Sequence, residues 1–225
     1  MEGPQALREA IAAGAVSEVF ASPDAAQRHA ALLATVPHVH LTDDRALAAL
    51  SETVTPQGLV GVASLVVVPV EQALAARPRL VAVLHEVSDP GNLGTVLRTA
   101  DAAGADAVVL SGQGVDPHNG KCVRASAGSL WHLPVAVVPT WESAWAAARG
   151  AGLRVAATSP RGASITGADL SAARAWVFGS EAHGLPAECL DAADEVLALP
   201  LPGRAESLNL ASAAAICLYA HLVRG

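Results

Sequence analysis

The chain has 225 residues, of which 52% are hydrophobic and 16% charged, and its formal net charge is −7. This length and composition suit one large or two small globular domains and exclude a disordered chain. The negative net charge argues against a protein that binds long nucleic acid through overall positive charge, but it does not exclude a local basic patch.

Residues 1–70 alternate short helix and strand signals and predict a small α/β domain. Proline near the start and glycine just past the end mark a first helix over residues 4–13. Ser22 and Pro23 cap a helix that we expect to run to about Val36, and Asp43 or Thr42 caps another over residues 45–52. Strands are expected over residues 16–22, 38–42 and 58–68.

Residues 71–79 form a predicted linker, and Pro69 and Pro78 bound a short helical segment there. From residue 80 onward the strand signals become unbroken apolar runs, typical of a parallel sheet that is buried on both faces. We expect strands over residues 80–87, 106–112, 133–139, 153–159, 175–180 and 195–200, with helices between them, among them 92–104 and 141–152. Residues 80–225 therefore predict an α/β domain whose ligands bind at the carboxyl ends of its strands.

Cysteine usage and both ends of the chain indicate a cytoplasmic protein. Cys122, Cys189 and Cys217 lie far apart without paired spacing, which predicts reduced structural thiols and no metal site. The first residues, MEGPQALREA, lack the apolar core of a signal peptide. The run LNLASAAAICLYAHLV is too short, and too interrupted by Asn209 and Ser212, for a membrane span, so we expect a buried helix.

Familiar nucleotide-binding motifs are absent from the sequence. Gly91 and Gly94 supply only G-x-x-G where a dinucleotide-binding loop needs G-x-G-x-x-G. The stretch from Gly114 to Lys121 is one residue too long for a P-loop and is followed by Cys122, where serine or threonine is required. No nucleophile elbow, zinc-protease motif or paired-cysteine motif appears.

Three polar islands interrupt the apolar framework instead. The first holds Asn92 and Arg98, the second is residues 178–186 with Glu181, and the third is residues 199–215 with Ser207 and Asn209. Taken singly, Asn92 and Ser207 could be helix caps, and Arg98 and Glu181 solvated charges. Because all three follow strands of one predicted parallel sheet, we expect them to meet in one site.

Together the islands resemble the three signature motifs of the SpoU (TrmH) family of RNA ribose 2′-O-methyltransferases, within the knotted SPOUT class. The matching stretches are DPGNLGTVLRTADAAGADAVVL, VFGSEAHGLP and LPLPGRAESLNLASAAAICLYA, in the family's order and spacing. EGPQALREAI and QGLVGVAS resemble the small ribosomal-protein-like RNA-binding domain upstream in many members, which usually begin with a further helix.

The resemblance implies a C-terminal trefoil knot, S-adenosylmethionine as methyl donor, and a homodimer formed through the knotted domain. It implies no metal and no membrane. It favours ribosomal RNA as substrate, with transfer RNA as the alternative; a non-catalytic RNA-binding relative and a nucleotide-binding oxidoreductase remain as weaker alternatives.

The resemblance also assigns roles to residues of this sequence. Those implied in cofactor binding are Thr158, Gly179, Gly184, Leu199, Ser207, Leu208 and Asn209; those implied in catalysis are Arg98, Asn92, Glu181 and Asn209; and those expected to contact RNA are Arg98, Lys121, Arg124, Arg161 and Arg204. A guanidinium stays protonated in proteins, so we expect Arg98 to hold a phosphate and stabilise charge on the 2′-oxygen rather than to act as a base. Asn92 would position Arg98 or the nucleotide, and Glu181 would anchor its loop or pair with a basic group.

Overall fold

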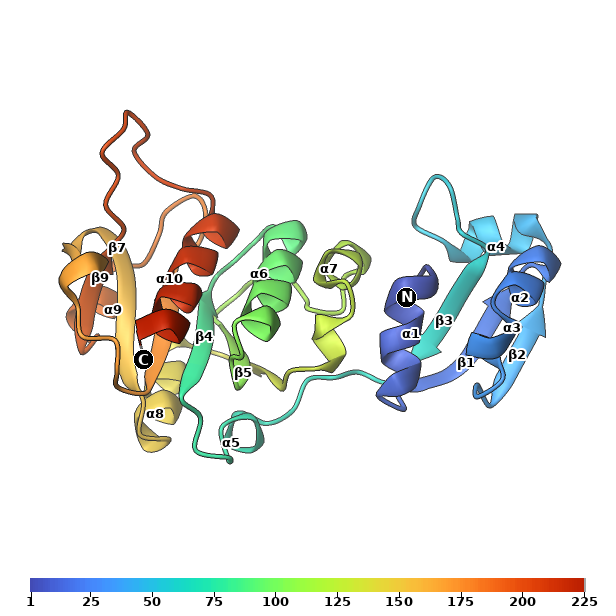
Figure 1. The fold of residues 1–225 in the computed structure, drawn as a ribbon, viewed down its shortest axis with the longest axis horizontal. Helices are drawn as coiled ribbons and strands as arrows, with labels where there is room; N and C mark the ends of the chain where they lie inside the picture. The colour runs from blue at the N-terminus through green and yellow to red at the C-terminus, as the bar shows by residue number, and fades with distance from the viewer. Residues whose placement is uncertain (225) are drawn as a thin grey trace.

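The computed structural model describes residues 1–224 of the chain. It consists of two α/β units at opposite ends of the long axis, joined by an extended segment (Figure 1). Each unit has its own sheet, one with three strands and one with six.

The N-terminal unit is built on a three-stranded sheet in the order β2-β1-β3. Its central strand β1 is parallel to β2 and antiparallel to β3. Leu7, Val19 and Leu59 lie in its core and are almost fully buried. The elements of this unit are α1 (Pro4–Ala12), β1 (Val16–Ala21), α2 (Pro23–Arg28), α3 (Ala30–Leu33), β2 (His38–Leu41), α4 (Asp44–Leu50) and β3 (Leu59–Ala63).

Two expectations for this unit are wrong in detail. The helix predicted to run from Pro23 to Val36 is two short helices, because His29 leaves helical geometry at φ −114° and ψ 25°. The strand predicted over residues 58–68 ends at Ala63. Its apolar tail instead follows the edge of the second sheet, where the Val68 N–H donates to the Val135 carbonyl at 2.9 Å. Apolar character alone did not reveal which sheet this tail would join.

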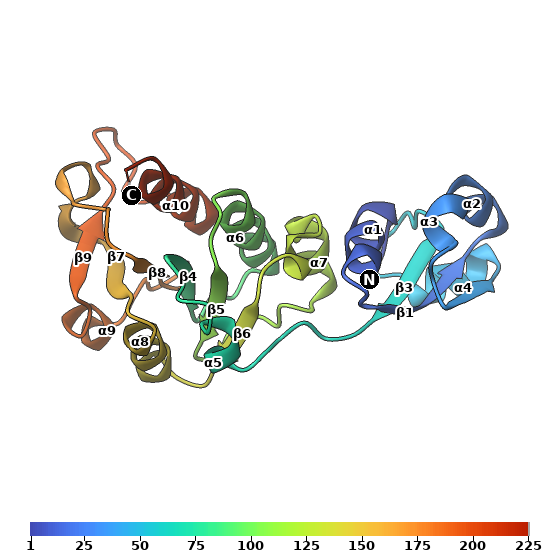
Figure 2. The same cartoon turned by 60° about the horizontal axis from the view of Figure 1, so that its bottom comes forward.

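The larger unit contains six strands, all parallel, in the order β6-β5-β4-β8-β7-β9. The predicted parallel sheet with helices on both faces is therefore confirmed (Figure 2). Its elements are α5 (Val70–Ala73), β4 (Leu80–His85), α6 (Pro90–Ala102), β5 (Ala107–Ser111), α7 (Gly120–Ser126), η1 (Ser129–Trp131), β6 (Val135–Val138), α8 (Trp141–Gly150), β7 (Arg154–Ser164), η2 (Ile165–Gly167), β8 (Arg174–Phe178), α9 (Ala187–Asp191), β9 (Glu195–Ala198) and α10 (Leu210–Arg224).

Both faces of this sheet are covered, as the unbroken apolar strands require. Along β4, Ala82 and Leu84 point toward the side of α6 and α10, where Leu97 packs. Val81 and Val83 point the other way, toward the side of α8, where Trp145 packs. Burial on both sides explains why these strands lack the alternation of polar and apolar residues.

The C-terminal helix α10 is buried on one face only, which corrects the expectation of a buried helix. Leu210, Ala214 and Leu218 are packed into the core beside α6. The opposite face exposes a row of large apolar side chains, Ile216, Tyr219, Leu222 and Val223. Within residues 1–224, no helix is long and apolar enough to cross a membrane.

Candidate active site

Three loops that are distant in sequence meet at the carboxyl edge of the larger sheet. The first follows β4 and leads into α6, the second follows β8, and the third joins β9 to α10. Since β4 and β8 are neighbours in the parallel sheet, the first two loops leave the same edge side by side. Helix α10 then packs beside α6 (Figure 1), which returns the third loop to the first.

Side-chain hydrogen bonds tie these three loops together. The Asn92 side-chain amide donates to Glu181 Oε1 at 2.8 Å, and the Asn209 amide donates to Asn92 Oδ1 at 3.0 Å. Both the backbone N–H and the hydroxyl of Ser88 donate to Glu181 Oε2 at 3.3 Å. The structure thus brings together Asn92, Glu181 and Asn209, one from each polar island.

The caps of the two helices explain why these amides are available. Asp89, not Asn92, caps α6: its Oδ1 accepts from the Asn92 N–H at 2.8 Å. Asn209, not Ser207, accepts from the first turn of α10, through the Ala211 N–H at 2.9 Å. The alternative that Asn92 and Ser207 serve as helix caps is therefore wrong, and the Asn92 side chain is left to bridge the other two loops.

Glu181 stays ionised at neutral pH. Partial burial works to raise its pKa, but hydrogen bonds from the Asn92 side chain and from nearby backbone N–H groups outweigh it and hold the pKa below its ordinary value. A carboxylate with a lowered pKa is a poor proton acceptor. Glu181 is paired with amide and hydroxyl groups and with no cation of residues 1–224, so of its two expected roles its contacts fit that of a loop anchor.

A cavity of about 370 Å³ opens beside this network. Its lining includes all of the predicted cofactor-binding residues except Asn209, together with Glu181; the matching residues are Thr158, Gly179, Gly184, Leu199, Ser207 and Leu208. Asn209 instead lies in the hydrogen-bonded network at the start of α10. Small residues and aliphatic walls of this kind suit a flat, partly apolar ligand that is held by backbone groups.

Gly179 is needed for the shape of the cavity. The second loop folds back on itself so closely that a Cβ at residue 179 would lie 2.2 Å from the carbonyl carbon of Gly184. Gly184 has φ +69°, a conformation that favours glycine. The Thr158 hydroxyl donates to the Val177 carbonyl at 2.8 Å, which holds the middle of β7 against β8.

Much of the cavity wall comes from residues to which the sequence assigned no role. These are apolar or small side chains of β7–η2, β8, β9, α10 and the loop between β9 and α10, among them Pro160, Ile165, Phe178, Leu197, Leu201, Ala213 and Cys217. Burial raises the pKa of the Cys217 thiol to about 12, so it is a protonated, apolar part of the wall. The sequence gives no signal for these residues, because an apolar residue that lines a cavity looks the same as one that fills a core. Ser88 was missed as well, although it directly precedes the first island.

The predicted RNA-contacting cations fall into two groups. Arg98, Arg161 and Arg204 are exposed, and their guanidinium groups make no hydrogen bond or ion pair within residues 1–224. Arg98 lies about 9 Å along α6 from Asn92, at 1.5 Å per residue, and does not join the hydrogen-bonded network. Lys121 and Arg124 are instead paired with carboxylates: Lys121 Nζ lies 2.9 Å from Asp89 Oδ2, and Arg124 Nη1 lies 3.4 Å from Glu2 Oε1.

Residues 79–219 match the family described as SpoU rRNA Methylase. The chain is 38% identical over 221 residues to the 23S rRNA (guanosine(2553)-2′-O)-methyltransferase RlmP of Bacillus subtilis, covering 97% of this chain and 86% of that one. It is 31% identical over 186 residues to the 23S rRNA (guanosine-2′-O-)-methyltransferase RlmB of Bordetella pertussis, covering 80% of this chain and 76% of that one.

Solved structures resemble both units together. An AdoMet-bound rRNA methyltransferase from Sinorhizobium meliloti superimposes with a TM-score of 0.86 at 30% identity, covering 98% of this chain and 85% of that one. The SpoU methyltransferase AviRb from Streptomyces viridochromogenes, in complex with AdoMet, gives a TM-score of 0.88 at 26% identity, covering 99% and 88%.

Proposed function

This chain belongs to the SpoU rRNA methylase family, and on that premise we propose that it methylates a ribose 2′-hydroxyl of large-subunit ribosomal RNA, with S-adenosylmethionine as methyl donor. The observation that carries the proposal is the identity, over nearly the whole chain, to an enzyme named for 2′-O-methylation of 23S rRNA. Because its substrate is ribosomal RNA, we place the enzyme in the cytoplasm.

S-adenosylmethionine fits the cavity at the carboxyl edge of the sheet. The volume of about 370 Å³, the aliphatic walls and the close backbone approach at Gly179 suit an adenosine held by main-chain groups. We assign Thr158, Gly179, Gly184, Leu199, Ser207 and Leu208 to the walls of this site. The bound molecule supplies an activated methyl group on a sulfonium, and the chain's own residues supply position and charge.

The hydrogen-bonded chain through Asn92, Glu181 and Asn209 serves to position the loops. Glu181 accepts from Asn92 and Ser88, which fixes the first loop against the second, and Asn209 fixes the third against the first. Loops held in one arrangement keep donor and acceptor aligned, and such alignment supplies much of the acceleration of a direct transfer. We therefore assign these three residues to positioning of the site and not to proton transfer.

Arg98 supplies the fixed positive charge on the RNA side. Its exposed guanidinium has no protein partner within residues 1–224, and it can make a bidentate contact with a phosphate next to the target ribose. The same charge stabilises the 2′-oxygen as its proton leaves. Exposed Arg161 and Arg204 lie on or near the loops that line the cavity and are assigned to the RNA backbone.

A homodimer accounts for the exposed apolar row on α10. Ile216, Tyr219, Leu222 and Val223 are 46%, 43%, 53% and 79% exposed and recur at helical spacing on one face. Such a stripe on a monomer marks an interaction surface, and a self-complementary pairing of two copies is the commonest way to cover one. We also propose that the chain is knotted after Glu195, since the loop after β9 returns to lie against the loops after β4 and β8.

The test uses purified protein, radiolabelled S-adenosylmethionine and three deproteinised acceptors: large-subunit ribosomal RNA, small-subunit ribosomal RNA and transfer RNA. We expect label in the ribose of large-subunit RNA, and calorimetric binding of S-adenosylhomocysteine but not of NAD. Label confined to transfer RNA would show that transfer RNA, and not ribosomal RNA, is the substrate. Binding of NAD without binding of S-adenosylhomocysteine would overturn the proposed function.

Substitution of Arg98 tests the role assigned to it. Arg98→Ala is expected to abolish methyl transfer while it leaves the affinity for S-adenosylhomocysteine nearly intact. Arg98→Lys keeps the positive charge but cannot make the bidentate contact, so its rate of methyl transfer separates the effect of charge from that of geometry. Turnover of Arg98→Ala within about tenfold of wild type, roughly 1.4 kcal/mol of barrier, would remove Arg98 from the mechanism.

A further inference from the structure

The N-terminal unit carries a net negative charge, so its overall charge does not attract RNA. Residues 1–70 carry seven acidic side chains and three basic ones, a formal net charge of −4. The acidic residues are Glu2, Glu9, Glu18, Asp24, Asp43, Asp44 and Glu52, and the basic residues are Arg8, Arg28 and Arg45. A phosphate backbone would be repelled by this balance unless the acidic side chains had another partner.

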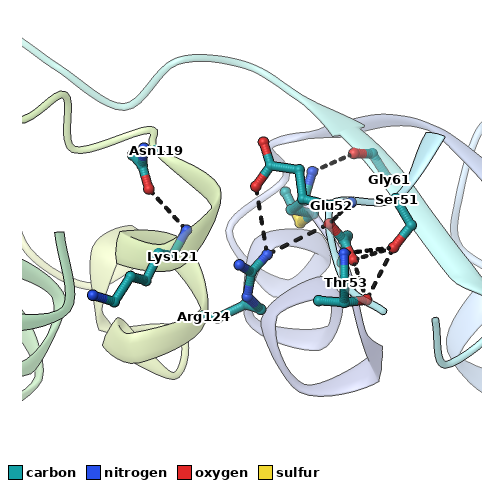
Figure 3. A network of polar contacts seen from close by, with 9 residues as sticks. Ser51, Glu52, Thr53, Gly61, Asn119, Lys121 and Arg124 are labelled. Atoms are coloured by element: carbon teal, nitrogen blue, oxygen red, sulfur yellow. Dashed lines mark hydrogen bonds and ion pairs between the residues drawn. The ribbon is translucent and has the colours of Figure 1, made fainter. Parts of the chain in front are cut away.

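Two of those carboxylates face Arg124 of α7 across the junction between the units (Figure 3). Arg124 Nη1 lies 3.4 Å from Glu2 Oε1 and 3.7 Å from Glu52 Oε2. Glu2 is held in place within its own unit, because it accepts from the Glu52 N–H at 2.7 Å and from the Thr53 hydroxyl at 2.8 Å. The carboxylates are thus presented to Arg124 by an ordered turn.

The other cation on α7, Lys121, is also paired with a carboxylate. Lys121 and Arg124 are three residues apart on α7, and their side chains point in different directions (Figure 3). Lys121 pairs with Asp89, which caps α6 in the first active-site loop. Each of these two cations of α7 is therefore paired with a carboxylate oxygen, a position that an oxygen of an RNA phosphate could also occupy.

A cavity of about 300 Å³ beside Arg124 opens between the two units. Its lining combines Arg124 and Ala127 with residues of the N-terminal unit, among them Glu2, Gln5, Thr53 and Thr55. The Arg124 side chain is 35% exposed and the Glu52 side chain 68% exposed, so solvent and a polyanion can reach the pair. Ion pairs of this exposure are individually weak, and phosphates can therefore displace the carboxylates.

We propose that the N-terminal unit docks on α7 as a stand-in for RNA, with Glu2 and Glu52 occupying Arg124 in place of a backbone phosphate. Binding of ribosomal RNA exchanges carboxylate for phosphate and loosens the contact between the units. The proposal rests on the RNA methyltransferase function, and it makes Arg124 a docking residue for RNA whose availability is controlled by the chain itself.

The first test compares Glu52→Gln with Glu18→Gln, which makes the same charge change in the same unit at His40, away from α7. The measurement is equilibrium binding of deproteinised large-subunit ribosomal RNA. We expect Glu52→Gln to bind about two- to fivefold more tightly than Glu18→Gln, which corresponds to the loss of one exposed competing ion pair. Equal affinities for the two variants would overturn the proposal.

The second test uses Arg124→Ala. This variant should bind the RNA more weakly and lower the slope of log affinity against log salt by about 0.7, the contribution of one single-strand phosphate contact. In the Arg124→Ala background, Glu52→Gln should have no further effect on affinity. Unchanged RNA affinity of Arg124→Ala would show that Arg124 only joins the two units, and the proposal would fail.

A third measurement follows the two units directly. Spin labels at Ala34→Cys and Gly150→Cys, both exposed positions, report the distance between the units, while the three native cysteines are buried. We expect a longer or broader distance distribution with ribosomal RNA, and an unchanged distribution would contradict the exchange. Methyl transfer by the same wild-type preparation separates the docking proposal from the proposed function. If wild type methylates the RNA, but Glu52→Gln binds RNA no more tightly than Glu18→Gln and RNA leaves the distances unchanged, only the docking proposal is lost.

Discussion

The substitution Gly179→Ala tests the cavity with a single methyl group. A Cβ at this position would lie 2.2 Å from the carbonyl carbon of Gly184, 2.3 Å from its oxygen and 2.4 Å from the Leu185 nitrogen. Ordinary contact begins near 3.4 Å, and all three neighbours are backbone atoms, so the loop has to retreat by about 1 Å. The same loop carries Glu181, so its displacement also strains the hydrogen bonds to Asn92 and Ser88.

Overpacking of this kind costs about 1–3 kcal/mol. If this cost falls on the conformation of the loop that binds the ligand, the affinity for S-adenosylhomocysteine decreases by about 5- to 150-fold. Calorimetry measures the affinity, and the matched control is Gly203→Ala in the third loop, where a Cβ would meet nothing within 4 Å. Wild-type affinity of Gly179→Ala, with Gly203→Ala also unchanged, would refute the assignment of this cavity to the methyl donor.

Three further outcomes are expected. Glu181→Gln replaces an acceptor by a donor that faces either Ser88 or Asn92. We expect the free energy of unfolding, measured by denaturant titration, to fall by about 0.5–1.5 kcal/mol and methyl transfer to drop, while the exposed Glu188→Gln changes neither. The hydrogen bond of His132 to Asp101 and its contact with Glu9 at 3.4 Å raise its pKa against the effect of partial burial. The stabilisation from these contacts is therefore complete below the ordinary histidine pKa and is lost as pH rises through the raised value. The excess thermal stability of wild type over His132→Ala should shrink as the pH rises above about 6.5, and a constant excess would contradict this. Tyr219→Asp on the exposed face of α10 should convert a dimer to a monomer in sedimentation, and a dimer that persists would place the subunit interface elsewhere.

The sheet and the convergence of the three islands were predictable because each rests on a local signal. Unbroken apolar runs such as LVAVLHEV occur where a strand is covered on both faces, and all six predicted strands are present. Polar residues just after such runs collect at one edge of a parallel sheet, which is why Asn92 and Glu181 were expected together. Their direct hydrogen bond confirms that expectation.

Other features depend on contacts that the sequence does not encode locally. Asp89 and Asn92 are both residue types that cap helices, so the sequence does not decide which of them caps α6. In the structure Asp89 is the cap, and the Asn92 side chain turns toward the second loop because Glu181 accepts its hydrogen bond there. Ile165 and Cys217 line the cavity because β7 extends past its apolar run and leads into η2, and because α10 packs against the sheet beside α6. The pairing of Arg124 with Glu2 and Glu52 joins residues more than 70 positions apart, and no spacing pattern indicates it.

The most direct measurement of the central claim is a nucleotide-resolution map of 2′-O-methylation in ribosomal RNA. The comparison uses cells that carry the gene, cells that lack it, and cells in which it is replaced by the Arg98→Ala variant. We expect one ribose methyl group in large-subunit RNA to be present in the first cells and missing in the other two. Identical large-subunit maps in all three, with or without a difference in transfer RNA, would contradict the account.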